Sequence, residues 1–266
     1  MSEAASSGDL APHRLSHLLA TARLGRSYEL LPSCGSTNDE VRARAAQGAP
    51  EGLLVVADTQ TGGRGRLGRT WHSPPGQNLY FSLLLRPALP AHAVAPLTLL
   101  AGAALARTLA AAEARPRLKW PNDLLLPAGS HMGKAAGILT EMASAGDGVR
   151  HIVLGVGLNV NQRVFPADLC GRATSVALST GTDGDRGWLL SRFLGEFEGI
   201  YDGFLQAGPA AGLEIWRQFA ALPQPCRVQH EGQTLQGLAL EADQLGALLV
   251  RDDAGRVHRV VSGEVS

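Results

Sequence analysis

Gly63, Gly65 and Gly68 follow an apolar, strand-like run and form a Gly-x-Gly-x-x-Gly pattern. This pattern marks a dinucleotide-binding fold when a helix follows directly and an acidic residue comes about 20 residues later. Here RTWHSPPGQN follows, with two prolines where the helix would begin, and neither Asp nor Glu occurs between Asp58 and Glu113. No Gly-Lys-Ser/Thr sequence follows either, so the sequence excludes both a dinucleotide fold and a P-loop.

The order of apolar runs predicts an α+β fold built on a mixed sheet. Strand-like runs outnumber helical ones, and the helical runs occur in groups. Residues 94–106 are the most apolar stretch, but they are too few to span a bilayer and predict a core helix. We expect helices over 37–47, 93–112, 186–206 and 210–219, and strands over 52–60, 78–87, around 118, 124–126, 135–144 and 150–161.

Composition and the spacing of apolar runs divide the chain into three parts. Residues 1–26 are expected to form a loose tail with one short helix near 15–22, and they lack the apolar core of a signal peptide. Residues 27–221 carry the runs assigned to the mixed sheet. From about Leu222, short apolar runs alternate with Gly-containing breaks, a pattern that predicts a small antiparallel barrel over 222–266.

Charge and cysteine content narrow the class of protein. The 266 residues include 24 basic and 24 acidic side chains, whereas dedicated nucleic-acid binders usually carry a surplus of cations. Cys34, Cys170 and Cys226 are odd in number and widely spaced, which favours reduced thiols over disulfides or a zinc site. We therefore expect a cytoplasmic protein without a nucleic-acid or membrane partner.

The segment TGGRGRLGRTW, residues 61–71, holds three arginines and no acidic residue. Glycines let backbone N–H groups approach a ligand, and arginines suit phosphate oxygens. Arg64, Arg66 and Arg69 therefore predict a phosphate clamp on a flexible loop. Taken alone, the segment fits a solvated loop or an RNA-binding loop as well, although no aromatic residues are interleaved with its arginines.

Only two of the 24 basic residues are lysines, Lys119 and Lys134, and the other 22 are arginines. A site that keeps lysine against this background needs a compact ammonium, which a guanidinium cannot replace. The alternative is chance survival on a solvated surface. Both lysines lie inside dense motifs, KWPND and GKAAGILTE, which favours the first interpretation.

The chain resembles the biotin protein ligases in the order of six motifs: STN at 36–38, TQ at 59–60, GRGRLGRTWHSPPGQNLYFS, KWPNDLLL, GKAAGILTE and GVGLNVN. The resemblance runs from about residue 33 to 161, and the C-terminal SGEVS fits it as well. It implies a mixed-sheet catalytic domain of the biotin/lipoate ligase type, followed by a small SH3-like β-barrel.

The resemblance implies a reaction in two steps that uses ATP, biotin and Mg²⁺. The biotin carboxylate attacks the α-phosphate of ATP to give biotinyl-5'-adenylate and pyrophosphate. A lysine of the biotin carboxyl carrier domain of a carboxylase then takes the biotinyl group as an amide. A lipoate–protein ligase on the same fold and a non-catalytic RNA-binding module are the alternatives, which ligand binding and salt-dependent RNA binding would distinguish.

The same resemblance assigns roles residue by residue. Lys134 and Arg66 are the expected catalytic residues, because a cation between the biotin carboxylate and the α-phosphate stabilises the developing charge. The expected biotin-binding residues are Ser36, Thr37, Asn38, Gln60, Gly63, Arg64, Arg66, Lys134, Gly137 and Gly157. The expected ATP-binding residues are Arg64, Arg66, Arg69, Trp71, Lys119, Asn122, Lys134 and Asn159. Asp123 is the expected Mg²⁺ ligand, although a turn by itself explains the PND sequence.

Local structure offers other roles for some of these residues. Thr37 is also the expected N-cap of its helix, with Glu40 completing a capping box, so its hydroxyl has two candidate partners. Trp71 fits a core position as well as a pocket wall. Gly137 and Gly157 are expected to permit a close approach to the backbone.

Two departures from the family pattern are visible. Too few residues precede the STN motif for the winged helix-turn-helix domain of many members, so we expect a ligase without a DNA-binding repressor role. PAGSHMG, residues 127–133, is longer than the usual connection and predicts a hairpin tip ahead of Lys134.

Exposed sheet edges, together with the oligomeric state that the resemblance to the family implies, lead us to expect a homodimer.

Overall fold

The computed structural model describes residues 8–230 and 232–265. Its strands are β1 (Tyr28–Leu31), β2 (Leu54–Ala57), β3 (Leu79–Leu85), β4 (Arg117–Lys119), β5 (Asp123–Ala128), β6 (His131–Ala145), β7 (Gly148–Leu158), β8 (Gln224–His230), β9 (Gln233–Ala242), β10 (Leu248–Arg251) and β11 (Val257–Val260). Its helices are α1 (Pro12–Leu18), α2 (Thr37–Ala46), α3 (Leu97–Ala111), α4 (Val176–Thr180), α5 (Arg186–Ala207) and α6 (Ala210–Phe219), with short 3-10 turns η1 (Gly8–Leu10), η2 (Arg66–Gly68) and η3 (Ala91–Ala93).

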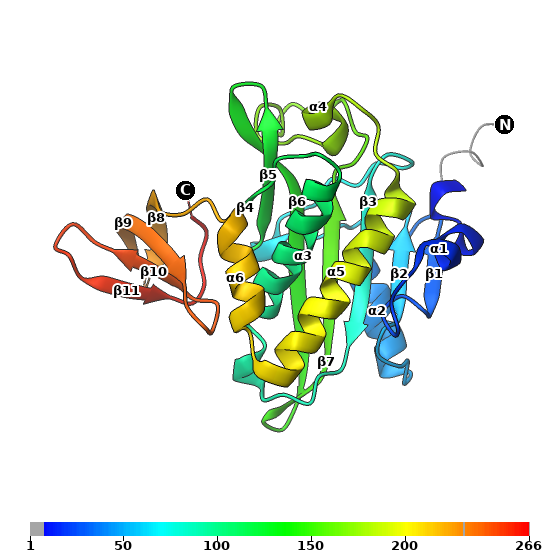
Figure 1. Ribbon diagram of the computed structural model, residues 1–266, viewed down its shortest axis with the longest axis horizontal. Helices are drawn as coiled ribbons and strands as arrows, with labels where there is room; N and C mark the ends of the chain where they lie inside the picture. The colour runs from blue at the N-terminus through cyan, green and yellow to red at the C-terminus, as the bar shows by residue number, and fades with distance from the viewer. Residues whose placement is uncertain (1–7, 231, 266) are drawn as a thin grey trace.

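A mixed sheet of seven strands forms the body, in the order β1-β2-β3-β7-β6-β5-β4 (Figure 1). Strands β1 and β2 run parallel, and the other neighbouring pairs run antiparallel. Helices α3, α5 and α6 lie side by side over one face of this sheet. The expected α+β class with a mixed sheet is confirmed.

Alternation along the strands gives the sheet two different faces. On β3, Phe81 and Leu83 belong to the main core, whereas Leu84 belongs to a second, smaller cluster. That second cluster joins Leu84 to Val41 of α2 and Val55 of β2. Helix α2 therefore covers the face opposite α3 and α5, and it brings the STN motif to that face.

Helix α3 is the most apolar helix, and the main core surrounds it. Residues Ala91–Ala111 are long and apolar enough to cross a bilayer, but 72% of the most apolar window is buried inside the protein. Gly102 lies in the middle of the helix, where an added Cβ would be 3.4 Å from Leu118 and 3.8 Å from Trp216. The structure confirms the expected core helix and begins it a few residues later than predicted.

The expected loose N-terminal tail is wrong for residues 8–26. Leu10 and Leu15 are fully buried in the main core. Glu198 of α5 accepts hydrogen bonds from three successive backbone N–H groups, those of residues 22–24. Burial raises the pKa of Glu198, but these three hydrogen bonds outweigh it and lower that pKa overall. The segment is therefore docked on α5, and the first seven residues lie outside the described part.

The C-terminal residues form a separate antiparallel sheet in the order β11-β10-β9-β8, to the left of the body in Figure 1. This order leaves β8 and β11 as the two edge strands. Trp120 ties the sheet to the body, because its indole N–H donates to the carbonyl of Gly246 at 2.9 Å. The expected short antiparallel strands are confirmed. They form a four-stranded sheet, and the SH3-like barrel stays a prediction.

The segment 127–133 is the tip of a β5–β6 hairpin, as predicted. Pro127 pairs with Met132 and Ala128 with His131. Gly129 adopts a φ of +68°, in the left-handed region that glycine tolerates best. The hairpin leaves Lys134 inside strand β6, opposite Leu125 of β5.

Candidate active site

A cavity of about 800 Å³ opens beside the α2 face of the sheet, between the glycine-rich segment and strands β5, β6 and β7. All the predicted site residues except Gly63 line it: Ser36, Thr37, Asn38, Gln60, Arg64, Arg66, Arg69, Trp71, Lys119, Asn122, Asp123, Lys134, Gly137, Gly157 and Asn159. Tertiary structure thus brings together motifs that are spread over more than 120 positions of the sequence.

Gly63 lies behind the cavity wall. Its carbonyl accepts the backbone N–H of Trp71 at 2.9 Å. An added Cβ would stand 2.7 Å from the carbonyl oxygen of Trp71 and 2.8 Å from Ser73 Oγ, which is closer than real contacts allow. Gly63 therefore closes the base of the glycine-rich loop, and its biotin contact stays a prediction.

The predicted capping box at the start of α2 is wrong. Ser36 occupies the N-cap position without a side-chain cap, and Thr37 is the first helical residue. Its backbone N–H donates to Gln60 Oε1 at 2.9 Å, so a distant amide caps the helix. Glu40 instead binds Arg44 one turn along, at 2.7 Å. The hydroxyl of Thr37 is free of the helix backbone and lies 2.7 Å from Ser82 Oγ.

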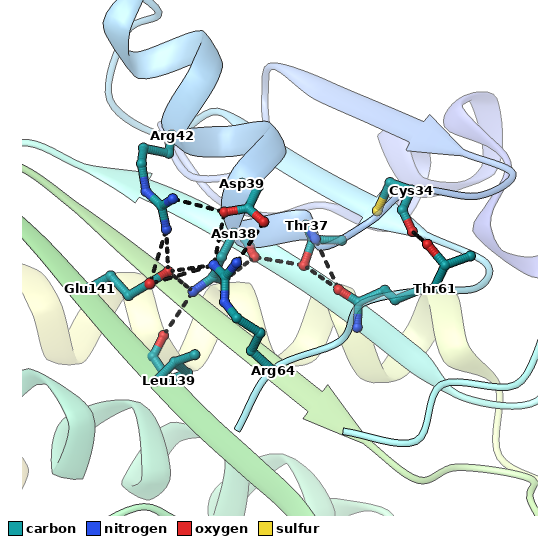
Figure 2. Close-up of polar contacts among 11 residues, drawn as sticks. Cys34, Thr37, Asn38, Asp39, Arg42, Thr61, Arg64, Leu139 and Glu141 are labelled. Carbon is teal, nitrogen blue, oxygen red and sulfur yellow. Dashed lines mark hydrogen bonds and ion pairs between the residues drawn. The ribbon is translucent and has the colours of Figure 1, made fainter. Parts of the chain in front are cut away.

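Arg64 lies in a cluster of ion pairs between α2 and β6 (Figure 2). Its guanidinium donates to both carboxylate oxygens of Asp39, at 2.6 and 2.9 Å, and lies 3.3 Å from Glu141 Oε2. Arg42 binds the same two carboxylates. The hydrogen bond from Arg64 holds the pKa of Asp39 below its usual value, although partial burial opposes the shift. The acids missing from the glycine-rich segment are supplied by other elements.

Arg66 and Arg69 are held by residues near the C-terminus. Arg66 donates to Asn122 Oδ1 at 3.3 Å and to the carbonyl of Gly263 at 3.1 Å. Burial lowers the pKa of Arg66, while the charges of Asp123 and Glu264 act in the opposite direction. Arg69 is more exposed and forms a bidentate pair with Glu264, with both distances 2.5 Å.

Lys134 points into the cavity from β6, and Asp123 holds its ammonium. The Nζ lies 2.6 Å from Asp123 Oδ1 and 5.4 Å from the centre of the Trp71 ring, within the range of a cation–π contact. Asp123 is the first residue of β5, paired with Lys119 of β4, so the PND sequence spans the tight β4–β5 connection. The structure places cation and carboxylate together.

Trp71 lies across the two predicted close-approach glycines. An added Cβ on Gly157 would stand 2.5 Å from the indole nitrogen of Trp71, and one on Gly137 would stand 3.1 Å from its ring. The group that approaches these two backbones is therefore the indole. Among the described residues, the buried indole N–H has no hydrogen-bond partner.

Asn159 and Lys119 both line the cavity. The Asn159 side chain is buried and donates to the carbonyl of Thr174 at 3.0 Å. That bond fixes its carboxamide and leaves its oxygen for other donors. Lys119 is half-buried, and its charge contributes to the lowered pKa of Glu264. Arg66, Lys119 and Lys134 line the cavity near the acids Asp123 and Glu264, and we call this its cationic end. Ser36, Thr37 and Gln60 line it at α2, and we call this its neutral polar end.

Comparisons with known proteins match this arrangement. Residues 31–159 match the model of the biotin/lipoate A/B protein ligase family. The chain is 35% identical to the bifunctional ligase/repressor BirA of Bacillus spizizenii, over 97% of this chain and 79% of that protein. It is also 35% identical to the biotin–[acetyl-CoA-carboxylase] ligase of Mycobacterium tuberculosis, over 90% of this chain and 88% of that one. The chain belongs to the biotin protein ligases.

A solved structure of a biotin protein ligase extends this finding to the fold. The enzyme of Aquifex aeolicus, in complex with biotin and ATP, is similar to this chain with a TM-score of 0.77 at 29% identity. The match covers 91% of this chain and 98% of that structure. The family that the motifs predicted is therefore confirmed over most of the chain.

Sequence reasoning missed several residues of this biotin ligase family member. Glu264 reaches the cavity from the C-terminus, and Glu141 reaches Arg64 from β6. Gly155 precedes the predicted Gly157 by two positions on β7, and an added Cβ would stand 2.1 Å from Asn38 Oδ1. The period of two along a strand could have pointed to Gly155, since both glycines face the same side. The two acids lie in the GKAAGILTE and SGEVS motifs, but the sequence assigned neither of them a role.

The residues around the cavity do not form a dedicated metal site. Within 8–230 and 232–265, no group of three or more His, Cys, Asp or Glu side chains is arranged to hold a metal ion. The predicted Mg²⁺ ligand, Asp123, is already paired with Lys134 at 2.6 Å. A divalent ion at that carboxylate would compete with the ammonium. The donors present fit anionic and neutral polar ligands instead.

Proposed function

We propose that this chain activates biotin with ATP and transfers it to a lysine of a biotin carboxyl carrier domain. In the first step a biotin carboxylate oxygen bonds to the α-phosphorus of ATP, and the bond to the pyrophosphate oxygen breaks. In the second step the acceptor amine bonds to the biotinyl carbon, AMP leaves, and the amine loses a proton. Relatives named biotin–[acetyl-CoA-carboxylase] ligase support this reading.

The observation that carries the proposal is the position of the Lys134 ammonium. It is held by Asp123 over the face of Trp71, inside a cavity with a cationic end and a neutral polar end. The reaction brings together two anions, a carboxylate and a triphosphate, so a fixed cation between them lowers their repulsion. The same cation stabilises charge that develops on the α-phosphate. Arg66 is half-buried beside it and serves the adenylate.

The neutral end suits the ring urea of biotin. Ser36, Thr37 and Gln60 present hydroxyl and amide groups there, next to the indole of Trp71. A neutral polar ring needs a few placed donors and acceptors within an otherwise apolar pocket. Gly137 and Gly157 let the indole lie flat against the sheet and so form the pocket wall.

Mg²⁺ would enter with the nucleotide phosphates, which it prefers over an all-protein cage. Asn122 and Lys119 lie on the cationic wall where the triphosphate would bind. Arg69 and Arg64 would reach phosphate oxygens only after leaving Glu264 and Asp39, respectively. The glycine-rich loop would therefore rearrange when substrates bind.

The proposal extends to the organisation of the chain. Residues 27–221 form the catalytic domain, and residues 222–266 form a second domain that we interpret as SH3-like. A homodimer built through sheet edges and a cytoplasmic location, where free thiols persist, complete the proposal. The balance of 24 basic and 24 acidic residues gives no reason to add a nucleic-acid partner.

ATP–pyrophosphate exchange tests the proposal directly. The purified protein with Mg²⁺ is given ATP and labelled pyrophosphate, with biotin, with lipoate or with neither acid. Biotin-dependent exchange is the expected result. Exchange with lipoate alone would move the chain to the lipoate ligases. Absence of exchange with either acid, from a folded protein, would overturn the ligase assignment and favour a binding function.

A further inference from the structure

We propose that Glu141 is a positioning residue that sets the hydrogen-bond polarity of the neutral end of the cavity, acting through Asn38 and Ser82. The inference rests on the proposed biotin ligase function, because it concerns the same pocket. Glu141 lies on β6 at the end of the GKAAGILTE motif, but the sequence assigned it no role. Its carboxylate reaches the first turn of α2 (Figure 2).

A buried chain of hydrogen bonds connects Glu141 to the cavity. Asn38 Nδ2 donates to Glu141 Oε2 at 2.6 Å, and Asn38 Oδ1 lies 2.6 Å from Ser82 Oγ. Ser82 Oγ in turn lies 2.7 Å from the hydroxyl oxygen of Thr37. Ser82 is completely buried, and Asn38 and Thr37 are each 4% exposed. Solvent therefore reaches Glu141, whose side chain is 32% exposed, but not the contacts among Asn38, Ser82 and Thr37.

The carboxylate determines which way the Asn38 amide faces. An ionised carboxylate only accepts hydrogen bonds, so the amide nitrogen has to face Glu141 and the amide oxygen has to face Ser82. Arg42 and Arg64 both pair with Glu141 and keep it in place. The amide oxygen occupies the space beside the backbone of Gly155, where an added Cβ would stand 2.1 Å from it.

The direction set at Asn38 passes on to Thr37. Ser82 has a single hydroxyl proton, and the amide oxygen at 2.6 Å can only accept, so Ser82 donates to Asn38. The oxygen–oxygen contact of 2.7 Å between Ser82 and Thr37 then requires Thr37 to be the donor. The Thr37 hydroxyl has no further proton to give, so toward the cavity that Thr37 lines it can only accept a hydrogen bond.

Gln60 adds a second acceptor to the same wall. Its Nε2 donates to Ser73 Oγ at 3.1 Å, and Ser73 donates to the carbonyl of Trp71. Gln60 Oε1 is therefore turned toward Thr37, whose backbone N–H it accepts at 2.9 Å. It is also a second possible acceptor for the Thr37 hydroxyl proton, at 3.2 Å against 2.7 Å for Ser82 Oγ. The pocket wall presents two neighbouring acceptors, and a ligand with an N–H group, such as a ring urea, satisfies them. Reversing the Asn38 amide would turn the Ser82 proton toward Thr37 and the Thr37 proton toward Gln60 Oε1, which would occupy one of these two acceptors.

Exchanging the two side-chain types tests the relay. In Glu141→Gln, the new amide oxygen stays with the arginines and its NH₂ group faces the NH₂ group of Asn38, which then has to turn over. In Asn38→Asp, two carboxylates face each other at the former 2.6 Å contact. In the double variant N38D/E141Q, the glutamine donates to the aspartate and Ser82 again meets an acceptor. Polarity and total charge are both restored.

Biotin-dependent pyrophosphate exchange and calorimetric biotin binding are measured on the wild type, the two single variants and the double variant. We expect each single change to raise the KM and Kd for biotin about tenfold, the size of an unsatisfied buried polar contact. The double variant should return to within about threefold of the wild type, and the KM for ATP should change less than about threefold throughout. Ser82→Ala, which cuts the relay and leaves every arginine pair intact, should reproduce the biotin-specific loss.

Glu196→Gln is the matched control. Its carboxylate also lies between two arginines, Arg107 at 3.3 Å and Arg192 at 2.8 Å, but on α5, remote from this cavity. This variant should match the wild type in biotin affinity. Thermal unfolding of each variant establishes that it is folded, and a single variant that unfolds is replaced in the comparison by Ser82→Ala.

The remaining outcomes show whether the relay fails or the proposed function fails. A double variant whose biotin affinity is no better than that of the worse single variant overturns the relay. A loss of ATP affinity alone, with no effect of Ser82→Ala, also overturns it, because Glu141 would then act through Arg64 alone. If the wild type itself supports no biotin-dependent exchange and binds no biotin, the proposed function fails and the inference fails with it. Wild-type activity with unaffected variants overturns the inference only.

Discussion

The ammonium of Lys134 lies 2.6 Å from the carboxylate of Asp123, across the β5–β6 hairpin. The sequence suggested separate roles for the two residues, a catalytic cation and a metal ligand. Their contact holds the ammonium beside the cavity by charge, although Asp123 Oδ1 has no aligned hydrogen bond among the described residues. Preorganised charge of this kind costs no reorganisation during the reaction, which is why it contributes strongly to catalysis.

Replacing Lys134 with Arg should lower biotin-dependent pyrophosphate exchange by roughly 10²–10³-fold, the usual loss for one preorganised donor. The guanidinium keeps the charge but is larger and planar, so it cannot occupy the space between Asp123 and Trp71 in the same way. Exchange kinetics at saturating ATP measure the effect. Arg192→Lys on α5 is the control. A rate within about threefold of the wild type would contradict a compact cation at position 134.

Asp123→Asn distinguishes an orienting carboxylate from a Mg²⁺ ligand. We expect the exchange rate to fall while the Mg²⁺ concentration for half-maximal rate stays the same, because the carboxylate binds Lys134. A Mg²⁺ titration of wild type and variant provides the comparison. An increased Mg²⁺ requirement in the variant would show that Asp123 is a metal ligand and would restore the sequence prediction.

Gly157→Ala should displace the Trp71 indole, since the new Cβ would stand 2.5 Å from its nitrogen. We expect weaker biotin binding and altered tryptophan fluorescence of the folded protein. Gly203→Ala is the control, because its Cβ would enter open space on α5, where alanine stabilises a helix by about 0.5–1 kcal/mol. Unchanged fluorescence and biotin affinity in Gly157→Ala would contradict the close packing of Trp71.

The pair between Arg69 and Glu264 predicts a pH dependence of the C-terminal contact. The hydrogen bond from Arg69, assisted by the charges of Lys119 and Lys134, lowers the pKa of Glu264 below 4.5. Because this carboxylate pKa is lowered, the contact stabilises the folded protein above pH 4.5. The stabilisation is lost as the pH falls through the pKa of Glu264 in the folded protein. NMR titration of the carboxyl group should give a value below 4.5 that rises in Arg69→Gln. An unchanged value in that variant would remove Arg69 as the cause.

Glu198→Gln should lower the free energy of unfolding by about 1–3 kcal/mol, because a buried carboxylate that accepts three backbone N–H groups loses its charge. The wild type keeps this stabilisation above pH 4.5 and loses it as the pH falls through the lowered pKa. Urea unfolding at neutral and acidic pH measures both effects. Glu214→Gln, an exposed partner of Arg217, should be near neutral. Equal stability of Glu198→Gln and the wild type would mean that residues 22–24 need no anion.

The sequence by itself determined most of the secondary structure. Helix α5 begins at Arg186 as predicted and ends within one residue of the predicted limit, and α6 matches its predicted limits. Their apolar spacing repeats over many residues, so the signal is local and strong. The prediction of a capping box at Thr37 failed although the residue types fit, because Gln60 supplies the cap from a different element. The helix-capping propensity of a residue shows that it can form the cap, but a residue from another element can form that hydrogen bond instead.

The sequence also determined which residues gather at the cavity, because the motifs of the family mark them. Only the tertiary structure decided what those residues contact. Arg64 meets Glu141 across 77 positions, and Arg69 meets Glu264 across 195. Trp71 occupies the space left by two glycines, and Asp123 faces a cation instead of a metal. Ion pairs and hydrogen bonds depend on distances of a few ångströms, and folding alone sets those distances between residues remote in the chain.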